Sequence, residues 1–400
     1  RGNGRSYGDS AVSSYNTIRM TNFNRILAFD SKNGQLIAQA GILLSDIINT
    51  FLPKGWFPNV TPGTKYVTLG GMVAADVHGK NHHKDGNFSN YVDWIDIISS
   101  SGEVLRCSRK SNSNIFNWTF GGMGLTGIII NIAFRLKKIP TSWIRQKTIC
   151  TKNIDQTIDI LEKNLDTTYS VAWIDCLTKN NNLGRSVITL GEHARIDELA
   201  RDIQNNPFSI TQKKKFVMPF GLPNIILNKV TAKLFNALYY GYNKWQTGSN
   251  IVDWDVYFYP LDRVTQWNRL YGSKGFVQFQ CVIPLKYSKI GIKELLLAIS
   301  NSSTASFLGV LKRFGRCESY FSFPMEGFTL AIDFPVSEES LKLMSQLDKI
   351  TLKYKGRFYL AKDSRIDSET FKKSESRLNK FKNFRKLQKN SHIFSSEQSK

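Results

Sequence analysis

The opening residues of the chain have the composition of a loop that binds a diphosphate. Gly2, Gly4 and Gly8 occur together with Arg1 and Arg5 in the run Arg-Gly-Asn-Gly-Arg-Ser-Tyr-Gly-Asp-Ser-Ala. Because glycine has no Cβ, such a backbone reaches positive φ and can turn several N–H groups toward one anion, while the arginines add fixed positive charge. Residues 1–11 therefore predict a phosphate-binding loop and a nucleotide cofactor.

A second glycine-rich segment covers residues 61–71, and the run Ala-Asp-Val-His-Gly-Lys-Asn-His-His follows it at residues 75–83. A single glycine is more often part of a turn than of a ligand site, but a cluster of glycines favours phosphate binding. A single histidine is usually structural, yet His78 stands in a glycine-flanked polar loop that does not fit a solvated helix face. Two such loops predict a large cofactor.

The bulk composition sets the broad class of the protein. With 400 residues, 41% of them hydrophobic, the chain is long enough for two domains or for one domain with a large cap. It contains no apolar run of about eighteen residues, so we expect no membrane-spanning helix. The 54 Lys and Arg against 32 Asp and Glu give a net charge of +22. This charge predicts an anionic partner (a phosphorylated substrate, a lipid headgroup surface or nucleic acid), although the dispersed basic residues also fit mere genome composition.

The five cysteines are widely spread and form no Cys-x-x-Cys pair. This spacing argues against a disulfide framework and against a zinc site, and it favours a reducing compartment; we expect no bound metal. The chain begins inside the glycine-rich loop without an initiator methionine or a signal peptide. We therefore expect a strand and a helix to precede it in a longer protein.

Hydrophobic patterning predicts an α+β chain with two sheets. We expect strands over residues 17–20, 36–39, 94–98, 128–134, 169–174, 254–259, 275–283 and 328–334, and helices over residues 44–52 and 292–299. The first domain ends near Pro140. Within the second, residues 207–246 are rich in lysine and aromatic residues and are interrupted by prolines, which predicts a mobile or surface-docking insertion. Residues 374–400 read as a basic helix and tail.

The motifs, in their order along the chain, resemble the vanillyl-alcohol-oxidase type of flavoprotein. They are Arg-Gly-x-Gly-Arg-Ser-Tyr-Gly-Asp at 1–9, Pro-Gly-Thr and Thr-x-Gly-Gly within 62–71, Asp-x-His-Gly-Lys-Asn-His-His at 76–83, Gly-Leu-Thr-Gly-Ile-Ile at 124–129 and Ala-Lys-Asp-Ser-Arg at 361–365. Any one of these motifs is weak evidence, but the set in register is specific. The similarity is greatest to the branch that oxidises a polyprenyl-phosphoryl ribose, and it runs from Arg1 to about Ser395.

The resemblance implies a particular domain order. A two-subdomain FAD-binding domain of the PCMH type would cover residues 1–140, with its N-terminal part missing. An antiparallel-sheet substrate (cap) domain with the insertion at 207–246 would cover residues 141–360, and residues 361–400 would return to the FAD site. The FAD would be non-covalent, because Asp9 stands where covalently flavinylated members often carry a histidine; Cys107 and His78 remain the formal candidates for a covalent bond.

The resemblance also assigns residues to the cofactor and to the chemistry. The implied FAD-binding residues are Arg1, Gly2, Gly4, Arg5, Ser6, Tyr7, Gly8, Asp9, Ser10, Gly63, Thr68, Leu69, Gly70, Gly71, Ala75, Asp76, Val77, His78, Gly127, Ile128, Tyr359 and Lys362. The implied catalytic and pocket residues are Lys362, His78, Lys312, Gln278, Gln280 and Tyr7.

The implied reaction is oxidation of the ribose 2′-hydroxyl to a ketone, the first half of an epimerisation that makes the arabinose donor for cell-wall glycans. Lys362 would stabilise the negative charge of the reduced flavin, although a surface lysine is the alternative. Gln278 and Gln280 alternate onto one face of a strand that would line the pocket or face solvent. The base is left open between His78 and a lysine whose pKa is lowered by burial.

Two other functions compete with this one. A sugar-lactone or alditol oxidase of the same flavin fold would act on a small soluble substrate, but the run Ala-Lys-Asp-Ser-Arg follows the polyprenyl-phosphoribose pattern. A non-catalytic module would bind nucleic acid or membrane through residues 213–215, Lys229, Lys233 and residues 372–389.

The resemblance also sets the expected partners. We expect a polyprenyl-phosphate-linked sugar as substrate, a separate NAD-dependent short-chain reductase that completes the epimerisation, and no nucleic acid. Peripheral membrane contact through residues 207–246 fits this substrate, because a polyprenyl phosphate must be lifted from a bilayer. The expected location is the cytoplasm or the periphery of the inner membrane, on either face.

Overall fold

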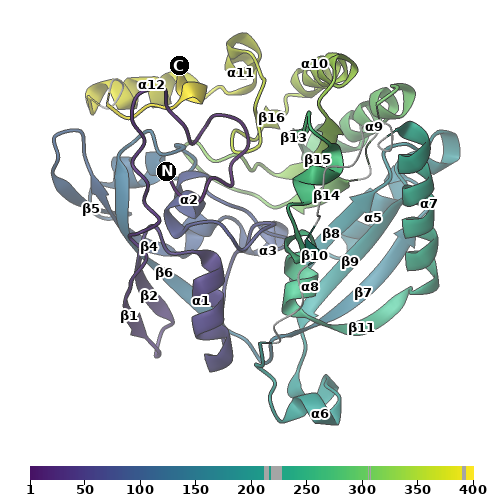
Figure 1. Cartoon of the computed structure of the whole chain (residues 1–400), viewed down its shortest axis with the longest axis horizontal. Coiled ribbons are helices and arrows are strands. Elements are labelled where there is room, and N and C mark those ends of the chain that lie inside the picture. Colours follow the sequence, from purple (N-terminus) through teal and green to yellow (C-terminus); the bar gives the residue numbers. More distant parts are fainter. Residues whose placement is uncertain (211–215, 218–227, 305, 307, 390–392) are drawn as a thin grey trace.

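The computed structural model describes the chain except for residues 211–215, 218–227, 305, 307 and 390–392. The described residues form two large sheets and one two-stranded sheet, with helices packed around them (Figure 1). The fold is therefore a mixture of helices and antiparallel sheet.

The first sheet is built from the N-terminal part of the chain, and all its neighbouring strands are antiparallel. Its order is β1 (Ile26–Asp30), β2 (Gln35–Gln39), β6 (Ile128–Lys138), β4 (Val92–Ile98) and β5 (Val104–Ser108), and β3 (Trp56–Pro58) also pairs with β6. The helices of this part are α1 (Leu44–Phe51), α2 (Leu69–Ala74), α3 (His82–Asp85) and α4 (Ser113–Thr119). Residues of α1, α2 and β6 share one buried apolar cluster.

The second sheet has eight antiparallel strands. Their order is β11 (Gly248–Asp253), β7 (Trp143–Thr151), β9 (Ser186–His193), β8 (Tyr169–Ile174), β14 (Gly309–Phe314), β15 (Gly327–Pro335), β13 (Phe276–Pro284) and β16 (Arg357–Phe358). A separate parallel pair joins β10 (Phe216–Val217) to β12 (Val264–Thr265).

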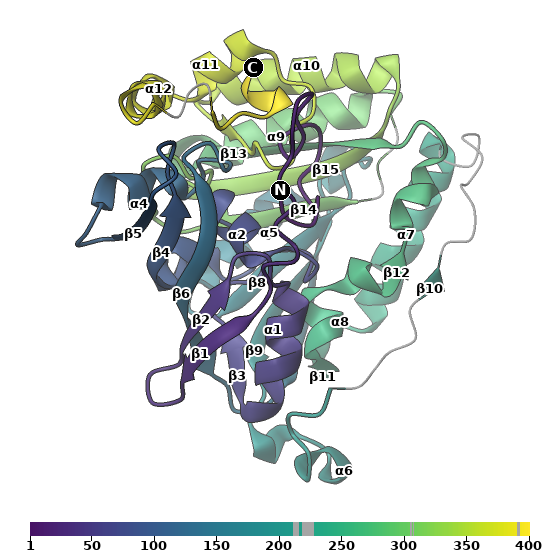
Figure 2. The ribbon, with the colours of Figure 1, turned by 60° about the vertical axis from the view of Figure 1, so that its left-hand side comes forward.

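One face of the second sheet is covered by three helices (Figure 2), α5 (Ile154–Lys163), α9 (Leu285–Asn301) and α10 (Glu338–Lys353). Helix α9 buries Ile292, Leu295, Leu296 and Ile299, the spacing that places side chains on one side of a helix. Helix α10 begins at an N-cap, Ser337, whose side chain accepts a hydrogen bond from the amide of Ser340. The remaining helices are α6 (Arg201–Gln204), α7 (Lys229–Trp245), α8 (Trp254–Phe258), α11 (Ser368–Ser374) and α12 (Leu378–Leu387).

Most of the expected elements are present. Strands occur at 36–39, 94–98, 128–134, 169–174, 275–283 and 328–334, and helices at 44–52 and 292–299. Two expectations were wrong. Residues 17–20 form no strand. The aromatic run at 254–259 forms helix α8, which starts where the side chain of Asp253 accepts a hydrogen bond from the amide of Asp255; this capping carboxylate favours helix over the strand that the composition suggested.

Among the described residues, no helix combines the length and apolar character needed to cross a bilayer. The predicted domain limits near residues 140 and 360 stay predictions. The lysine run at 213–215 and the prolines of the insertion, Pro219 and Pro223, lie outside the described residues.

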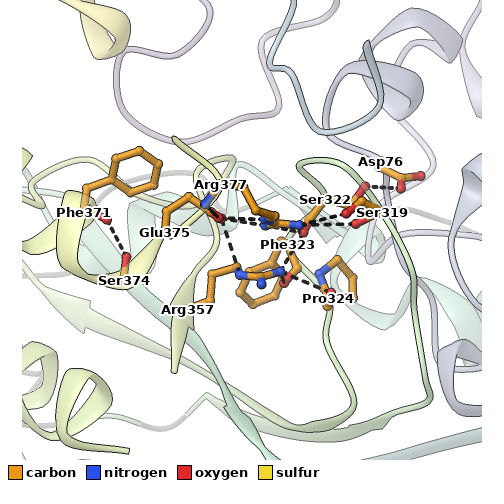
Figure 3. A network of polar contacts seen from close by, with 10 residues as sticks. All are labelled: Asp76, Ser319, Ser322, Phe323, Pro324, Arg357, Phe371, Ser374, Glu375 and Arg377. Atoms are coloured by element: carbon orange, nitrogen blue, oxygen red, sulfur yellow. Dashed lines mark hydrogen bonds and ion pairs between the residues drawn. The ribbon is translucent and has the colours of Figure 1, made fainter. Parts of the chain in front are cut away.

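A buried ionic network fastens the connection between β14 and β15 (Figure 3). The Glu375 carboxylate is paired with two guanidiniums, those of Arg377 at 2.6 Å and Arg357 at 3.4 Å. Both arginines also donate hydrogen bonds of 3.0 Å to the carbonyl oxygen of Ser322. The Ser322 hydroxyl in turn donates to Asp76, which precedes the α3 region. The network therefore joins residues 375–377 to strand β16, to the connection between β14 and β15 and to the loop after α2.

We expect Glu375→Ala to lower the free energy of unfolding by about 3–5 kcal/mol, because it leaves two largely buried guanidiniums without their carboxylate. The control is Glu338→Ala, which removes an exposed ion pair with Lys342 and should cost no more than about 0.5 kcal/mol. Urea unfolding of the two variants and of the wild type measures the difference. Equal losses in both variants would contradict the expectation.

Candidate active site

Residues from both sheets enclose a cavity of about 1450 Å³. Its wall is formed by the N-terminal loop, by α2 and its flanking loops, by the start of β6, by β13, β14 and β15, and by residues 359–364 and 393–396. Sites for drug-sized ligands usually enclose about 300–1,000 Å³, so this cavity has room for a larger molecule.

The N-terminal loop is held between two elements. On one side, a Cβ on Gly2 would lie 2.1 Å from the Oγ1 atom of Thr68, the N-cap residue of α2. On the other side, the amide of Tyr7 donates a 2.9 Å hydrogen bond to the carbonyl oxygen of Ala361. Gly8 has a φ of +61°, and a Cβ there would lie 2.6 Å from the carbonyl oxygen of Asp363. The loop keeps its position because these approaches admit no side chain.

The polar groups that line the cavity fit an FAD molecule. No described residue accepts a hydrogen bond from the backbone amides of residues 2–6. The Oγ atom of Ser10, the Nδ1 atom of His78 and the Oδ2 atom of Asp333 are buried in the wall without a hydrogen-bond partner. Buried polar groups are normally satisfied, so these donors and acceptors indicate a polar ligand that completes them.

All of the residues predicted for catalysis lie on the cavity wall, namely Lys362, His78, Lys312, Gln278, Gln280 and Tyr7. The residues predicted for FAD lie there too, with three exceptions: Asp9, Leu69 and Asp76. Leu69 is fully buried in the apolar cluster of the first sheet. The structure brings the set together, while the roles of its members stay predictions.

Asp76 shapes the loop behind the cavity. Its φ is +39°, and its fully buried carboxylate accepts hydrogen bonds from the amide and hydroxyl of Ser89, from the side-chain amide of Asn87 and from the Ser322 hydroxyl. Burial raises the pKa of Asp76 above its usual value, although these hydrogen bonds act in the opposite direction. Asp76 therefore fixes the turn that presents His78 to the cavity.

Three strands supply a polar wall. In the register of the sheet, Gln278 of β13 lies opposite Asp333 of β15, and Lys312 of β14 lies opposite Thr329 of β15. Residues paired in this way point to the same face. The side-chain amide of Gln278 donates to the Asp333 carboxylate, and that of Gln280 donates to the Thr329 hydroxyl at 3.4 Å. Both glutamines thus face the cavity rather than bulk solvent.

Two buried lysines add positive charge to the cavity. The Nζ atom of Lys362 lies 3.8 Å from the ring centroid of Tyr7, a cation–π contact. Burial lowers the pKa of Lys362 to about 8, although the charge of Asp333 opposes this shift. Burial and the charge of Lys362 lower the pKa of Lys312 to about 8. Both lysines are mostly protonated at pH 7 and lose their charge in alkaline solution.

His78 is packed among aromatic rings. Its ring centroid lies 4.7 Å from that of Phe314 and 5.1 Å from that of Tyr359. Burial, followed by the nearby charge of Lys312, lowers the pKa of His78 well below its usual value. The imidazole is therefore neutral at pH 7 and a weak base.

Asp333 is the polar residue that the sequence did not single out. Its side chain is fully buried, one carboxylate oxygen accepts from Gln278, and the other has no partner. Burial raises the pKa of Asp333 to about 6, although Gln278 and Lys362 act in the opposite direction. The signal in the sequence is a single carboxylate inside the apolar strand 329–335.

Comparison with known proteins agrees with this geometry. The family model for the FAD binding domain matches residues 1–108. A decaprenylphosphoryl-β-D-ribose oxidase of Mycolicibacterium smegmatis is 36% identical over 405 residues, which cover 99% of this chain and 87% of the relative. The chain belongs to the decaprenylphosphoryl-β-D-ribose oxidase family. It is an FAD-dependent oxidoreductase.

Other relatives are more distant. An uncharacterized protein of Streptomyces coelicolor is 26% identical over 89% of this chain and 98% of its own length. The L-gulonolactone oxidase of Bos taurus is 27% identical, but the match covers only 41% of this chain and 36% of the relative. The lactone oxidases are thus partial matches, whereas the decaprenylphosphoryl-β-D-ribose oxidase matches nearly end to end.

The formal candidates for covalent flavin attachment differ in position. Cys107 is fully buried in the core of the first sheet and does not line the cavity. His78 does line the cavity. Within the described part of the chain, no group of His, Cys, Asp and Glu side chains is arranged to hold a metal ion.

We expect Gly8→Ala to destabilise the flavin-free protein more than Gly4→Ala does. Both glycines have positive φ, so each alanine adds a left-handed strain of about 1–2 kcal/mol. Only the Cβ at position 8 meets backbone atoms, whereas the space around position 4 is open. The clash should add about 1–3 kcal/mol. Urea unfolding measures the stability of both variants. Equal stability would show that the approach of Gly8 to residues 363–364 does not restrict the loop.

We expect Asp333→Asn to stabilise the protein in a pH-dependent way. The pKa of Asp333 is about 6 in the folded state and about 3.9 in an unfolded chain, so its ionisation weakens the fold as the pH rises from about 4 to about 6. The full penalty above pH 6 is roughly 2–3 kcal/mol. The variant should exceed the wild type by that amount at pH 8 and match it near pH 4. A difference that is independent of pH would refute the assignment.

Proposed function

We propose that this member of the family oxidises the 2′-hydroxyl of a polyprenyl-phosphoryl ribose to the 2-keto sugar. The observation that carries the proposal is the end-to-end match to a decaprenylphosphoryl-β-D-ribose oxidase. The positive charge of Lys312 and Lys362 in the cavity also supports it, because the substrate carries a phosphodiester.

The residues that hold FAD in this proposal come from two loops and one helix. The amides of residues 2–6, together with Arg5, bind the pyrophosphate, and residues 68–71 at the start of α2 lie beside it. Gly127 and Ile128 contact the adenosine half. The FAD-binding domain has the two-subdomain PCMH arrangement over residues 1–140, and the substrate domain spans residues 141–360.

When bound, FAD supplies the acceptor for the hydride that leaves the carbinol carbon. The chain has three tasks in the same step. Lys362 provides the positive charge that stabilises the anionic reduced cofactor. Gln278 and Gln280 orient the sugar through hydrogen bonds, and Lys312 binds the phosphate or a sugar oxygen. The hydroxyl proton passes to a basic group on the wall. The candidates are Asp333, His78, although it is a weak base, and a lysine whose pKa is lowered by burial, such as Lys312.

The runner-up is an aldonolactone or alditol oxidase of the same fold. The partial matches to L-gulonolactone oxidases favour it, but they cover less than half of the chain.

In the main proposal, a keto product on a polyprenyl phosphate requires a reductase to complete an epimerisation. We therefore place a separate NAD-dependent reductase after this enzyme and the reaction at the inner membrane.

The test is anaerobic reduction of the FAD-loaded protein. We expect the flavin absorbance to bleach on addition of a polyprenyl-phosphoryl ribose and to persist on addition of an aldonolactone. Lys362→Met should slow the bleaching by about 10²- to 10³-fold, since it removes one charge that stabilises the reduced cofactor. Lys342→Met, at a lysine whose side chain is 81% exposed, is the control. Bleaching by the lactone alone would establish the runner-up.

A further inference from the structure

Helix α7 exposes its large apolar side chains, whereas an ordinary surface helix buries them. Its buried residues are Ala232 and Asn236, whereas its large apolar residues face outward. Val230, Leu234, Leu238, Tyr242 and Trp245 are between 60% and 92% exposed. Helices of globular proteins normally bury the apolar stripe and expose the polar one.

Polar contacts lock α7 in this orientation. The side-chain amide of Asn236 donates to the Asp175 carboxylate at 2.8 Å and to the carbonyl oxygen of Ser306 at 3.3 Å. The hydroxyl of Tyr240 donates to the carbonyl oxygen of Thr151 at 3.1 Å. Because buried amide and hydroxyl groups must keep such partners, rotation that buries the apolar side would leave them unsatisfied. The outward apolar face is therefore a fixed feature of the fold.

The exposed residues form one continuous face, which we call the α7 apolar face: Val230, Leu234, Leu238, Tyr242 and Trp245. With about 3.6 residues per turn, they fall on one side of the helix, and Lys233 and Lys244 fall beside them. Trp245 and Tyr242 stand at the C-terminal end of the helix. Aliphatic residues flanked by aromatic rings and lysines are the composition of helices that lie in the interface of a bilayer.

The inward side of helix α7 packs on strand β8, which is next to the cavity-lining strand β14. Val310 lines the cavity and is in register with Trp173 of the neighbouring strand β8, so both side chains point to the same face of the sheet. The ring of Trp173 packs on that of Tyr239 of α7, with a centroid distance of 4.7 Å. Figures 1 and 2 place α7 at the periphery of the molecule. One side chain, that of Trp173, thus separates the helix from the cavity-lining strand.

We propose that the α7 apolar face docks onto the surface of an anionic phospholipid bilayer and so brings the cavity to its lipid-linked substrate. The choice of a bilayer as the occupant rests on the proposed function, because a polyprenyl chain resides in a membrane. The net charge of +22 and the lysines beside the face match anionic headgroups. The apolar residues supply the part of the binding that salt does not screen.

The first experiment is sedimentation of the FAD-loaded protein with vesicles made of equal parts phosphatidylglycerol and phosphatidylcholine. The wild type should sediment with these vesicles and bind less to vesicles of phosphatidylcholine alone. The double variant Leu234→Glu/Leu238→Glu should lower the vesicle-bound fraction by at least about tenfold, because it puts two carboxylates where the bilayer would be. Ile290→Glu, on α9, changes a similarly exposed apolar residue (63%) and should bind like the wild type.

A second measurement separates this inference from the proposed function. The double variant should bleach with a short-chain, water-soluble phosphoryl ribose as fast as the wild type, and slowly with the long-chain lipid presented in vesicles. Failure of the wild type to bleach with the soluble analogue would overturn the proposed function while leaving vesicle binding as found.

Three outcomes would overturn the docking proposal. The wild type could stay in the supernatant, the double variant could bind vesicles as well as the wild type, or Ile290→Glu could lose binding equally. Light scattering after gel filtration tests whether a second copy of this chain covers the α7 apolar face instead. If the wild type is a dimer and the double variant is a monomer, the α7 apolar face is a contact between two copies and the docking proposal is wrong.

Discussion

The position of the N-terminal loop is the constraint on which the cavity depends. The loop passes so close to Thr68 on one side and to residues 361–364 on the other that Gly2 and Gly8 leave no room for a Cβ. Further along, the amide of Glu397 donates to the carbonyl oxygen of Val12, and Figure 2 shows the purple N-terminal segment beside the yellow C-terminal turn. Segments from opposite ends of the chain therefore build one wall, and neither end completes the site alone.

The charged side chains that line the cavity affect one another's pKa values. Burial lowers the pKa of both Lys312 and Lys362, and the charge of Lys362 lowers that of Lys312 further. Asp333 counters this effect on Lys362, while its own ionisation is disfavoured by burial. Burial thus shifts the pKa of all three side chains. Ionisable groups with shifted pKa values are common at catalytic sites.

Local patterns in the sequence were sufficient to place the glycine-rich loops and the amphipathic helices, since each depends on residues close together in the chain. Lys362 was named from the resemblance; it lies on the cavity wall, and its role stays a prediction. Asp333 was missed because its significance comes from its pairing with Gln278 on the neighbouring strand, and Gln278 lies 55 residues away in the sequence. Asp76 was assigned to the cofactor as part of the segment 76–78, which resembles the family motif. Its carboxylate is hydrogen-bonded to Asn87, Ser89 and Ser322, partners that a local pattern does not reveal. The aromatic run at 254–258 became helix α8 through a capping aspartate that composition alone does not weigh.

The contacts that residues 361–397 make with the N-terminal loop have a consequence for biosynthesis. During translation the loop is made before the first sheet, whereas Ala361, which accepts its hydrogen bond from Tyr7, and Glu397, which donates one to Val12, are made after both sheets. The first sheet can form early, since its strands all lie before residue 140. The cavity, by contrast, gains the wall formed by residues 359–364 and 393–396 only after both sheets have been made, so the glycine-rich loop lacks these contacts until then.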